Sequence, residues 1–337
     1  MHGQPFSDDN YQFEPLVTKT EDVTYLAEGN ANVVFTINRS LEPPMVLRVR
    51  KAGDSTYPSY VLMDFYEHEV KRMFACHQIL PLKLMEMTRA IIQNLNVVIS
   101  KAEAEGIRPE KRHGTYIDPH ESTAIVLPDM RARGDKESMI EFKPKWLLQS
   151  PSAPQGSLRC RTCALREMRA SDDRKQGKNE KQPSNRPTAF CPFDLLASNI
   201  EVLKSVAVAV GAPNDKIDQF ANALKNNQTI QRLRKVQELR NNVGLHHIRK
   251  HDDMSLSMSI RDCTIFIKIT ESTDGPLIQS VLADMDMKKL DGEHFLKWEK
   301  TESRLISEGW YQGTEGDGQS DKHPCNLDLG SVKAVQE

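Results

Sequence analysis

This sequence has no long apolar segment, few cysteines and few aromatic residues. No stretch approaches the run of about 18 apolar residues that a membrane-spanning helix requires, so we expect no membrane partner. Six cysteines in 337 residues are too sparse for a disulfide framework, and Met1–Asn10 lacks the basic-then-apolar order of a signal peptide. We therefore expect reduced thiols and a nuclear or cytoplasmic location.

The chain also lacks several common catalytic signatures. It contains neither a GxxxxGK[ST] loop nor a GxGxxG loop in consensus form. It shows no Ser-His-Asp order and no HExxH helix, which mark common hydrolases and zinc proteases. Any chemistry must therefore depend on other motifs.

Charge is distributed unevenly behind a formal net charge of −2. Residues 141–188 hold eleven Lys/Arg against five Asp/Glu, and residues 225–250 hold seven against one. Such blocks indicate a polyanion site, or else a solvated helix face or a disordered tail. Aromatic residues are sparse in both blocks, which argues against a stacking platform for single-stranded RNA. We expect no nucleic-acid partner.

Small residues separate two β-branched runs near the start of the chain. The segment Glu28-Gly-Asn-Ala-Asn32 joins Val23–Ala27 to Val33–Ile37, which is a strand–turn–strand pattern. Small residues permit a close approach of backbone N–H groups to phosphates, although a simple hairpin turn accounts for the same pattern equally well. The candidate phosphate-binding residues are Gly29, Asn30, Ala31 and Asn32.

Charged side chains alternate in the segment Glu141-Phe-Lys-Pro-Lys145. Side chains alternate between the faces of a strand, so a strand here places Glu141, Lys143 and Lys145 on one face. This grouping suits the binding of phosphates and ribose hydroxyls. A cross-strand charge ladder on a solvated face is the alternative.

Three aspartates occur near the ends of late apolar runs. Asp262 lies between two such runs and is either a turn former or a base that orients an attacking hydroxyl. Asp284 and Asp286 share one face of an expected strand, and Lys288 follows on that face. Carboxylates are costly to bury unless they are paired or bound to a metal ion, and Mg²⁺ accepts one or two such ligands. The simpler alternative is that only one of Asp284 and Asp286 is buried.

Two cysteines have the spacing of half a zinc site. They lie in the segment Cys160-Arg-Thr-Cys163. The residues that would complete such a site are Cys191, His113, His246 or His247, and the spacing favours none of them. Two free thiols on a basic helix are the alternative.

Periodicity predicts an α+β fold in two lobes, 1–130 and 131–337, with the boundary near Asp129. In the first lobe the expected strands are Val23–Ala27, Val33–Ile37, Met45–Arg50 and Ala124–Leu127, and the expected helices are Tyr60–Cys76 and Thr88–Glu105. In the second lobe the expected strands are Met139–Lys145, Met254–Ile260, Thr264–Thr270 and Val281–Met287. The expected helices there are Arg159–Arg169, Ile200–Val210, Ile217–Lys225, Thr229–Arg240 and Phe295–Glu308. The polar segment 170–188 is expected to be a mobile loop.

Taken in order, these motifs resemble those of the inositol-pentakisphosphate 2-kinases, and of fungal members in particular. The similarity runs from about Tyr25 to Trp298, and Glu141–Lys145 is close to the family motif Glu-[Ile/Val]-Lys-Pro-Lys. Further segments that resemble the family are Arg108-Pro-Glu-Lys-Arg112, Cys191-Pro-Phe-Asp-Leu195, Asn226-Asn227, Arg261-Asp-Cys-Thr264 and Asp284-Met-Asp-Met-Lys288. The resemblance implies a kinase-like architecture with a smaller β-rich N-terminal lobe and a larger α/β C-terminal lobe.

The activity that the resemblance implies is ATP-dependent phosphorylation of the 2-hydroxyl of inositol 1,3,4,5,6-pentakisphosphate, with Mg²⁺ as the metal. It implies Asp262 and Lys143 as catalytic residues, and Asp284 with Asp286 as metal ligands. The implied nucleotide contacts are Gly29, Asn30, Ala31, Asn32, Arg48, Asp129, Glu141, Asn226 and Asn227. The implied inositol phosphate contacts are Arg112, Lys145, Arg169 and Lys288. We expect a monomer.

Two alternative functions stay open at this point. A polyanion-binding module with a dead kinase-like site would use the same basic blocks, although it would have no need of Asp262 and Asp284. A kinase of another inositol phosphate would fit the charge distribution equally well.

Overall fold

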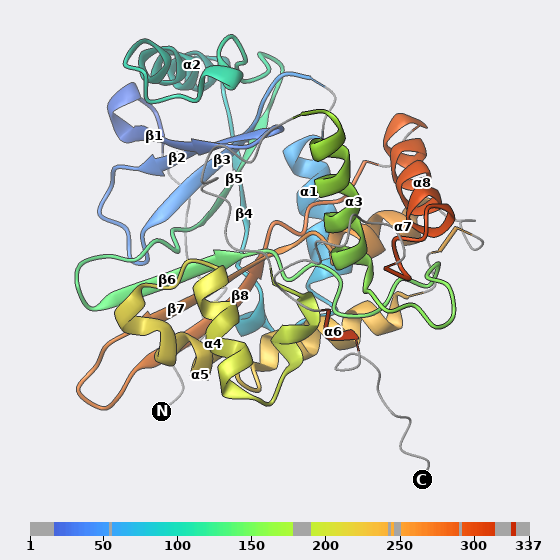
Figure 1. Cartoon of the computed structure of the whole chain (residues 1–337). Helices are drawn as coiled ribbons and strands as arrows, with labels where there is room; N and C mark the ends of the chain where they lie inside the picture. Colours follow the sequence, from blue (N-terminus) through green and yellow to red (C-terminus); the bar gives the residue numbers. More distant parts are fainter. Residues whose placement is uncertain are drawn as a thin grey trace. The chain divides into compact units, whose positions relative to one another are not determined.

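The computed structural model describes residues 17–53, 56–177, 190–241, 244–245, 251–289, 292–313 and 325–327 (Figure 1). It has a mixed α+β fold with two antiparallel sheets, so the predicted α+β class is confirmed, and the kinase-like arrangement of two lobes stays a prediction. The chain divides into two compact units, one made of residues up to Arg131 with Asp286–Lys289 and the other of the remaining residues from Ala132. No helix within these described ranges is both long and apolar enough to span a membrane.

The first unit is built on a five-stranded antiparallel sheet. Alternate residues of its second strand are buried, because successive side chains point to opposite faces of a sheet. Helix α2 (Arg89–Ala104) packs Leu95 and Ile99 into the same core as Val33 and Phe35. In spatial order the strands are β1 (Val23–Glu28), β2 (Asn32–Ile37), β3 (Met45–Arg50), β5 (Thr123–Pro128) and β4 (Lys83–Glu86).

The first unit differs from the expected pattern in two places. The predicted helix Tyr60–Cys76 is a shorter helix, α1 (Ser59–Phe65), followed by a π-helical turn over Tyr66–Val70. The Tyr66 hydroxyl donates to Leu80 O at 3.0 Å, a tertiary contact that no local pattern reveals. Strand β4 is absent from the predicted set, because four residues with one buried side chain give too short an alternation.

The second unit contains a three-stranded antiparallel sheet and most of the helices. Its strand order is β6 (Glu137–Phe142), β7 (Thr264–Thr270) and β8 (Leu277–Ala283). Helix α5 contacts β7, and helix α6 contacts β8. The helices are α3 (Arg161–Lys175), α4 (Ile200–Ala209), α5 (Ile217–Leu224), α6 (Gln228–Leu239), α7 (His251–Ser259) and α8 (Gly292–Ser307) (Figure 1). Short 3-10 turns in the two units cover Thr20–Asp22, Cys76–Gln78, Glu110–Arg112, Pro192–Leu196 and Asn214–Lys216.

The predicted strand Met254–Ile260 is wrong, since this segment forms helix α7. Its alternating apolar and polar residues mimic a half-buried strand. The serines that supply the polar positions are themselves buried, so the segment has no solvent face. Ser259 Oγ donates to Ser255 O at 2.8 Å, one helical turn earlier, and so satisfies a buried hydroxyl within the helix.

Three further boundaries of the second unit also differ from the expected ones. The strand predicted over Met139–Lys145 ends at Phe142, and the strand predicted over Val281–Met287 ends at Ala283. Of the segment 170–188 expected to be a mobile loop, residues 170–175 continue helix α3. The part of that predicted loop from 178 to 188 lies outside the described residues.

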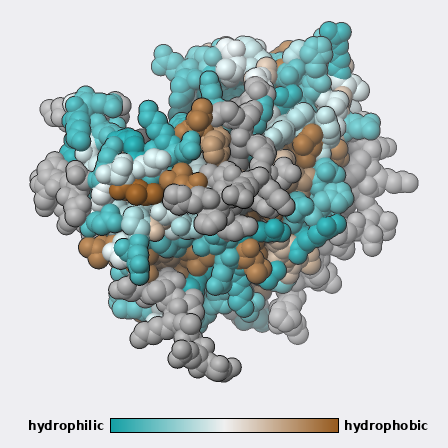
Figure 2. Space-filling view, turned by 90° about the vertical axis from the view of Figure 1, so that its right-hand side faces the viewer, coloured by the Kyte–Doolittle hydropathy of each residue, from teal (hydrophilic) through white to brown (hydrophobic). Residues whose placement is uncertain are grey.

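Figure 2 shows one face of the molecule, on which hydrophilic residues predominate and hydrophobic ones lie in small groups. Large exposed apolar side chains come from separate elements, such as Leu239 of α6 and Leu296 of α8. Singly exposed apolar residues are normal in folded proteins, so they give no argument for a docking surface.

A buried group of charged side chains lies under the turn between β1 and β2. Glu28 accepts from Arg108 Nε at 2.6 Å and from Lys51 Nζ at 2.8 Å, and all three side chains are at most 3% exposed. Lys51 Nζ also donates to Gly29 O at 2.9 Å. Burial alone would raise the pKa of Glu28, but the hydrogen bonds from Arg108 and Lys51 hold this pKa below its ordinary value.

We expect Glu28→Gln to lower the free energy of unfolding at neutral pH by about 3–5 kcal/mol, because it removes the carboxylate paired with buried Lys51 and leaves Arg108 with Glu103 alone. Urea unfolding of the full chain measures this change. The matched control is Glu67→Gln, since the Glu67–Lys71 pair is 38% and 37% exposed, and its removal should cost about 1 kcal/mol or less. Equal losses of unfolding free energy in the two variants would contradict a stabilising role for the buried Glu28 carboxylate.

Wild-type protein and Glu28→Gln should also differ in acid. The lowered pKa means that Glu28 stabilises the fold above its unfolded pKa of about 4.3, and that this contribution disappears as pH falls through the folded pKa. Wild-type stability, measured by urea unfolding across this range, should therefore fall more steeply below about pH 4.3 than that of Glu28→Gln.

Candidate functional site

The loop Gly29–Asn32 is the hairpin turn of the first unit. The backbone N–H of Gly29 donates to Asn32 O at 2.8 Å, and that of Lys51 donates to Ala31 O at 2.9 Å. Gly29 has no left-handed φ, and a side chain at this position would meet no protein atom within 4 Å. The fold itself does not require glycine here, so the missing side chain leaves the backbone open to a ligand.

Arg112 reaches this loop from the 3-10 turn Glu110–Arg112. Its Nη1 donates to Asn30 Oδ1 at 2.7 Å, which joins a predicted substrate residue to a predicted nucleotide residue. Its Nε is buried and has no hydrogen-bond partner among the described residues. A guanidinium group with an unused donor suits a phosphate oxygen.

Arg48 and Asp286 form a bidentate ion pair within the first unit. The guanidinium nitrogens donate to the two carboxylate oxygens at 2.9 and 2.8 Å, and the side chains are 11% and 13% exposed. The prediction that Asp284 and Asp286 share one strand face is wrong, because β8 ends at Ala283 and Asp284 has a φ of 55°. The role of Asp286 as a metal ligand stays a prediction, and in this structure Arg48 neutralises its charge.

Residues just beyond one end of each of the three strands in the second unit come together at one edge of the sheet. Antiparallel pairing places Phe142 opposite Ile265 and Thr264 opposite Ala283, so the end of β6, the start of β7 and the end of β8 are neighbours. The predicted residues beyond these ends are Lys143 and Lys145 after β6, Asp262 before β7 and Asp284 after β8. Sheet register therefore explains why residues far apart in the sequence meet here.

These four side chains form one hydrogen-bonded group. Lys143 Nζ donates to Asp284 Oδ2 at 3.0 Å and to Asp262 O at 2.8 Å, and it lies 3.4 Å from Asp262 Oδ2. Lys145 Nζ donates to Asp262 Oδ1 at 2.7 Å. Lys143 and Lys145 lie beyond the end of β6, so the prediction that they share one strand face with Glu141 is wrong. Both lysines nevertheless contact Asp262.

Left-handed backbone conformations occur at these same predicted positions. The non-glycine residues with positive φ among those described are Lys145 at 60°, Asn226 at 54° and Asp284 at 55°. Such conformations cost energy for residues with a side chain and gather at sites where geometry serves function. All three residues belong to the predicted site.

Burial and neighbouring charges shift the pKa values of Lys143 and Glu141. Desolvation would lower the pKa of Lys143, but Asp284 and Asp262 raise it above its ordinary value, so Lys143 stays charged at neutral pH. Desolvation by the surrounding protein and the charge of Asp284 raise the pKa of Glu141, and Lys143 partly offsets this. The Glu141 side chain itself is exposed on β6.

Gln237 of helix α6 fixes the backbone on both sides of this group. Its fully buried side chain donates to Lys145 O at 2.8 Å and to Ile260 O at 3.1 Å, and it accepts from Leu147 N at 2.8 Å. One amide therefore links the segment that carries Lys145 to the segment that carries Asp262. Sequence reasoning missed Gln237, because it looks like one more polar residue of a basic helix.

Arg261 fixes the turn that carries Asp262. Its buried guanidinium donates to Ser257 O at 2.9 Å and to Asn241 Oδ1 at 2.9 Å, and it lies 4.6 Å from the Trp146 ring centroid. Burial, and secondarily the charge of Arg161, lower the pKa of Arg261 to about 9. The side chain before Asp262 is thus held from several sides, which restricts how far the carboxylate can move.

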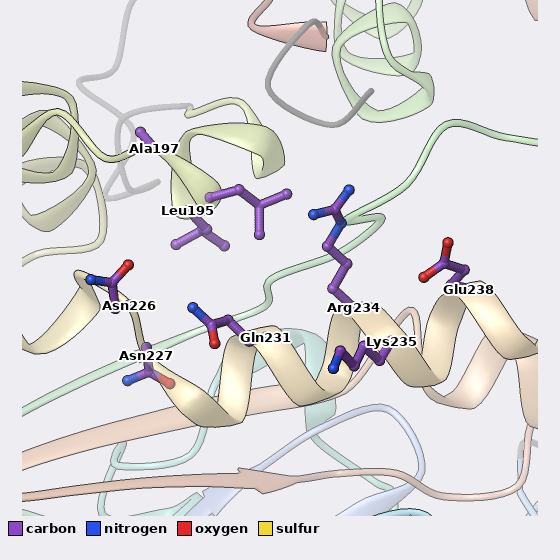
Figure 3. A pocket seen from close by; sticks show the side chains of 9 residues that line it. Leu195, Ala197, Asn226, Asn227, Gln231, Arg234, Lys235 and Glu238 are labelled. Carbon is purple, nitrogen blue, oxygen red and sulfur yellow. The ribbon is translucent and has the colours of Figure 1, made fainter. Parts of the chain in front are cut away.

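A pocket of about 320 Å³ lies along helix α6 in the second unit (Figure 3). Arg234 and Lys235 lie on α6, and Leu195 and Ala197 come from another segment (Figure 3). The lining includes the predicted nucleotide residues Asn226 and Asn227 but none of Lys143, Asp262 and Asp284. The full lining is Leu195, Leu196, Ala197, Asn226, Asn227, Gln231, Arg234, Lys235 and Glu238.

The two asparagines of the pocket have different structural roles. Asn227 is buried and caps α6, since its side chain accepts from Ile230 N at 3.1 Å and donates to Ala223 O at 2.9 Å. Asn226 is exposed and has the left-handed φ. Arg234 and Lys235 were not predicted individually, and the only signal for them was the basic block 225–250.

The remaining predicted residues lie outside these groups. Asp129 is paired with Arg131, whose Nη2 donates to Asp129 Oδ2 at 2.7 Å. Arg169 is exposed on α3, and Lys288 is half-buried in the segment Asp286–Lys289 of the first unit. Their proposed roles stay predictions.

Comparison with known proteins gives a family match and several relatives. The family model described as inositol-pentakisphosphate 2-kinase matches residues 25–227 and 204–304. A protein of Yarrowia lipolytica named inositol-pentakisphosphate 2-kinase is 24% identical over 302 residues, which are 86% of this chain and 92% of the relative. A protein of the same name from Debaryomyces hansenii is 25% identical over 75% of this chain and 77% of the relative. Another from Kluyveromyces lactis is 21% identical over 84% of this chain and 94% of the relative.

We expect Gln237→Met to lower the free energy of unfolding, because it removes the side-chain partner of Leu147 N and Lys145 O and leaves Ile260 O only the weak donor Cys263 Sγ. Each buried backbone group that finds no new partner costs about 1–3 kcal/mol. Urea unfolding measures the loss. Gln231→Met is the matched control, since Gln231 is exposed on the same helix and its substitution should change stability by about 0.5 kcal/mol or less. A Gln237→Met protein as stable as this control would show that the amide does not hold the two segments.

Proposed function

Because this chain belongs to the inositol-pentakisphosphate 2-kinase family, we propose that it transfers the γ-phosphate of ATP to the 2-hydroxyl of inositol 1,3,4,5,6-pentakisphosphate, giving inositol hexakisphosphate. The observation that carries the proposal is the group of Lys143, Lys145, Asp262 and Asp284 at one edge of the second sheet. Phosphoryl transfer needs fixed cations for the phosphates and carboxylates for the metal and the attacking hydroxyl, and this group supplies both.

Asp262 is the proposed base. Its carboxylate is 40% exposed, so a substrate hydroxyl has access to it, and two lysines orient it. In the proposed reaction Asp262 accepts a hydrogen bond from the 2-hydroxyl and takes its proton as the oxygen attacks the γ-phosphorus, while the bond from this phosphorus to the β,γ-bridging oxygen breaks and ADP leaves. Lys143, which is charged at neutral pH, neutralises the transferred group.

Asp284 is the proposed ligand of Mg²⁺. Its carboxylate is 42% exposed, and carboxylate oxygen is the donor that Mg²⁺ prefers. Mg²⁺ keeps most of its other positions for water and phosphate oxygens, so one or two carboxylates suffice. When bound, the ion would neutralise charge on the ATP phosphates.

The first unit is the proposed nucleotide-binding part of a kinase-like architecture. Support comes from the open backbone at Gly29 and from the guanidinium groups of Arg48 and Arg112. In this proposal the ATP phosphates approach the loop Gly29–Asn32, and Arg48 exchanges Asp286 for nucleotide. Asp129, Glu141, Asn226 and Asn227 are the further proposed nucleotide contacts.

The many phosphates of the substrate require several fixed cations. Arginine binds phosphate in a bidentate manner and lysine acts as a point charge, so the proposed contacts are Arg112, Lys145, Arg169 and Lys288. The proposal also includes a monomeric protein that resides in the nucleus, the cytoplasm or both. A binding module without activity has less support, because it would not need the accessible carboxylates of Asp262 and Asp284.

We expect purified protein with ATP, Mg²⁺ and inositol 1,3,4,5,6-pentakisphosphate to form inositol hexakisphosphate, seen as a new peak on anion-exchange chromatography. Asp262→Asn should lower kcat by about 10²–10⁴-fold, since it removes the base but keeps the side-chain shape. ATP binding, measured by calorimetry, should persist in this variant.

The matched control is Asp274→Asn, an exposed aspartate in the turn between β7 and β8 of the same sheet, which should keep full turnover. Undiminished turnover in Asp262→Asn would remove the assigned role of this residue. Tight binding of the pentakisphosphate by wild-type protein without any product would favour the binding module instead.

A further inference from the structure

The residues next to Lys145 and Asp262 in the chain form a buried contact of their own. Trp146 follows Lys145 and Arg261 precedes Asp262, so each accessible site residue has a buried neighbour. The guanidinium carbon of Arg261 lies 4.6 Å from the centroid of the Trp146 ring. The two segments therefore meet twice, once through the salt bridge between Lys145 and Asp262 and once through this cation–π pair.

A second guanidinium group lies over the same indole ring. The guanidinium carbon of Arg161, at the start of helix α3, is also 4.6 Å from the Trp146 ring centroid. Arg161 is buried, and its Nε donates to Glu302 Oε2 of helix α8 at 2.6 Å. A cation over an aromatic face is attracted to the ring, and this attraction strengthens where water is excluded. Two buried cations thus hold the indole of Trp146.

The fully buried carboxylate of Glu302 fixes Arg161 in this position. Glu302 Oε1 also accepts from Ser150 Oγ at 2.7 Å and from the Tyr311 hydroxyl at 2.6 Å. Burial and the charge of Glu302 raise the pKa of Tyr311, so its hydroxyl keeps the proton that it donates. Arg161 cannot move away from the ring without leaving a buried carboxylate unpaired, which is costly.

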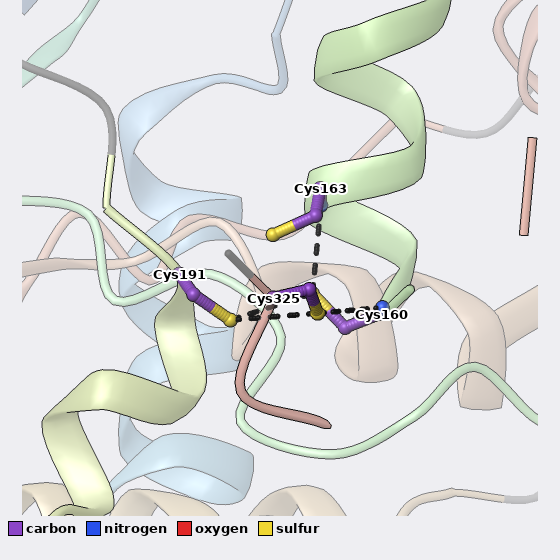
Figure 4. A group of neighbouring side chains, drawn as sticks. All are labelled: Cys160, Cys163, Cys191 and Cys325. Atoms are coloured by element: carbon purple, nitrogen blue, oxygen red, sulfur yellow. Dashed lines mark hydrogen bonds between the residues drawn. The ribbon is translucent and has the colours of Figure 1, made fainter. Parts of the chain in front are cut away.

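Cysteines from three parts of the chain meet at the start of the helix that carries Arg161 (Figure 4). The sulfur atoms of Cys160, Cys163, Cys191 and Cys325 all lie within 4.8 Å of one another. Of the predicted partners of Cys160 and Cys163, the structure brings Cys191 to them, and it adds Cys325, which no motif contains. Cys160 N donates to Cys325 Sγ at 3.1 Å, so this contact fixes the backbone one residue before Arg161.

The N–H groups of Arg261 point at the carboxyl ends of two helices. Its Nη2 donates to Gln237 O at 3.2 Å and to Arg240 O at 3.4 Å at the end of α6, and its Nη1 donates to Ser257 O of α7 at 2.9 Å. The carboxyl end of a helix carries partial negative charge, which suits a cation. The partners of Arg261 among the described residues are therefore neutral groups together with the Trp146 ring.

Stability alone gives no reason for this arrangement. Two guanidinium groups buried with one carboxylate cost more than apolar side chains of similar volume would. The left-handed backbone of Lys145 adds a further cost, and such a conformation persists only where its surroundings over-determine it. Gln237 binds the carbonyl of Lys145, and the anchored ring of Trp146 fixes the residue that follows, so the segment cannot relax.

We propose that Trp146 and Arg261 are positioning residues for the phosphoryl transfer, because their contact holds Asp262 against Lys145 before the substrate binds. This inference rests on the proposed function and deepens it. Both side chains are buried, so they act through the neighbours that they hold rather than on the substrate. Groups held at a fixed separation raise the rate of the chemical step without changing how tightly ATP binds.

The test compares Trp146→Leu with Trp146→Phe in the full chain, by the formation of inositol hexakisphosphate. We expect Trp146→Leu, which lacks an aromatic face, to lower kcat about 10–100-fold, because small misplacements of reacting groups have effects of this size. The KM for ATP should stay unchanged. Trp146→Phe keeps an aromatic face and should retain most of kcat. Trp310→Leu is the matched control, because Trp310 is buried elsewhere in the second unit, and it should keep kcat.

Urea unfolding reports the stability of each variant, and kcat is compared only under conditions where the variants are fully folded. If Trp146→Leu does not fold, tetrafluorotryptophan placed at position 146 by codon suppression decides the question. Fluorine withdraws electrons from the ring face and keeps the shape of the indole, so it weakens the attraction for a cation. We expect this replacement to lower kcat at position 146 and to leave kcat unchanged at position 310.

The positioning role and the proposed function fail in different ways. Wild-type protein that forms no inositol hexakisphosphate would overturn the proposed function and the positioning role with it. Active wild-type protein, with kcat unchanged by Trp146→Leu or by tetrafluorotryptophan at position 146, would overturn the positioning role alone. Equal losses of kcat in Trp146→Leu and Trp310→Leu, or in Trp146→Leu and Trp146→Phe, would overturn it as well.

Discussion

Two ammonium groups and two carboxylates neutralise one another at the edge of the three-stranded sheet. This charge balance constrains the rest of the second unit. Lys143 and Lys145 lie two residues apart in one short segment and would repel each other without Asp262. Left-handed backbones at Lys145 and Asp284 cost about 1–3 kcal/mol each, and stability alone gives no reason for them. Gln237 and Arg261 hold both segments in this arrangement through bonds to buried backbone carbonyls.

Exposure separates charges that hold the fold from charges that are available for chemistry. The carboxylate of Glu28 is fully enclosed with Arg108 and Lys51, so no substrate reaches it, and its role is to stabilise the turn between β1 and β2. The carboxylates of Asp262 and Asp284 are 40% and 42% exposed and keep oxygen surface for a ligand. Exposed ion pairs stabilise a protein little, so stability does not explain why four charges are gathered there.

Sequence periodicity located most elements because their burial is regular. Strands β2 and β3 are found within one residue of their predicted bounds, since one face of each packs into the core. Helix α7 was missed because its serines are buried, so polarity no longer reports exposure. The end of β8 was missed because the left-handed residue that follows it, Asp284, has no compositional signature outside glycine. Pro144, which lies two residues beyond β6, is the signal that could have placed the end of that strand.

Individual site residues could be predicted where a short motif contains them, and not where tertiary structure supplies them. Lys143, Lys145, Asp262 and Asp284 lie in motifs, and antiparallel register brings them together. Gln237 lies in no motif, and its importance comes from two backbone carbonyls far away in sequence. Cys325 is a similar case, because its sulfur lies 3.8 Å from that of Cys191 although 134 positions separate the two residues in the sequence.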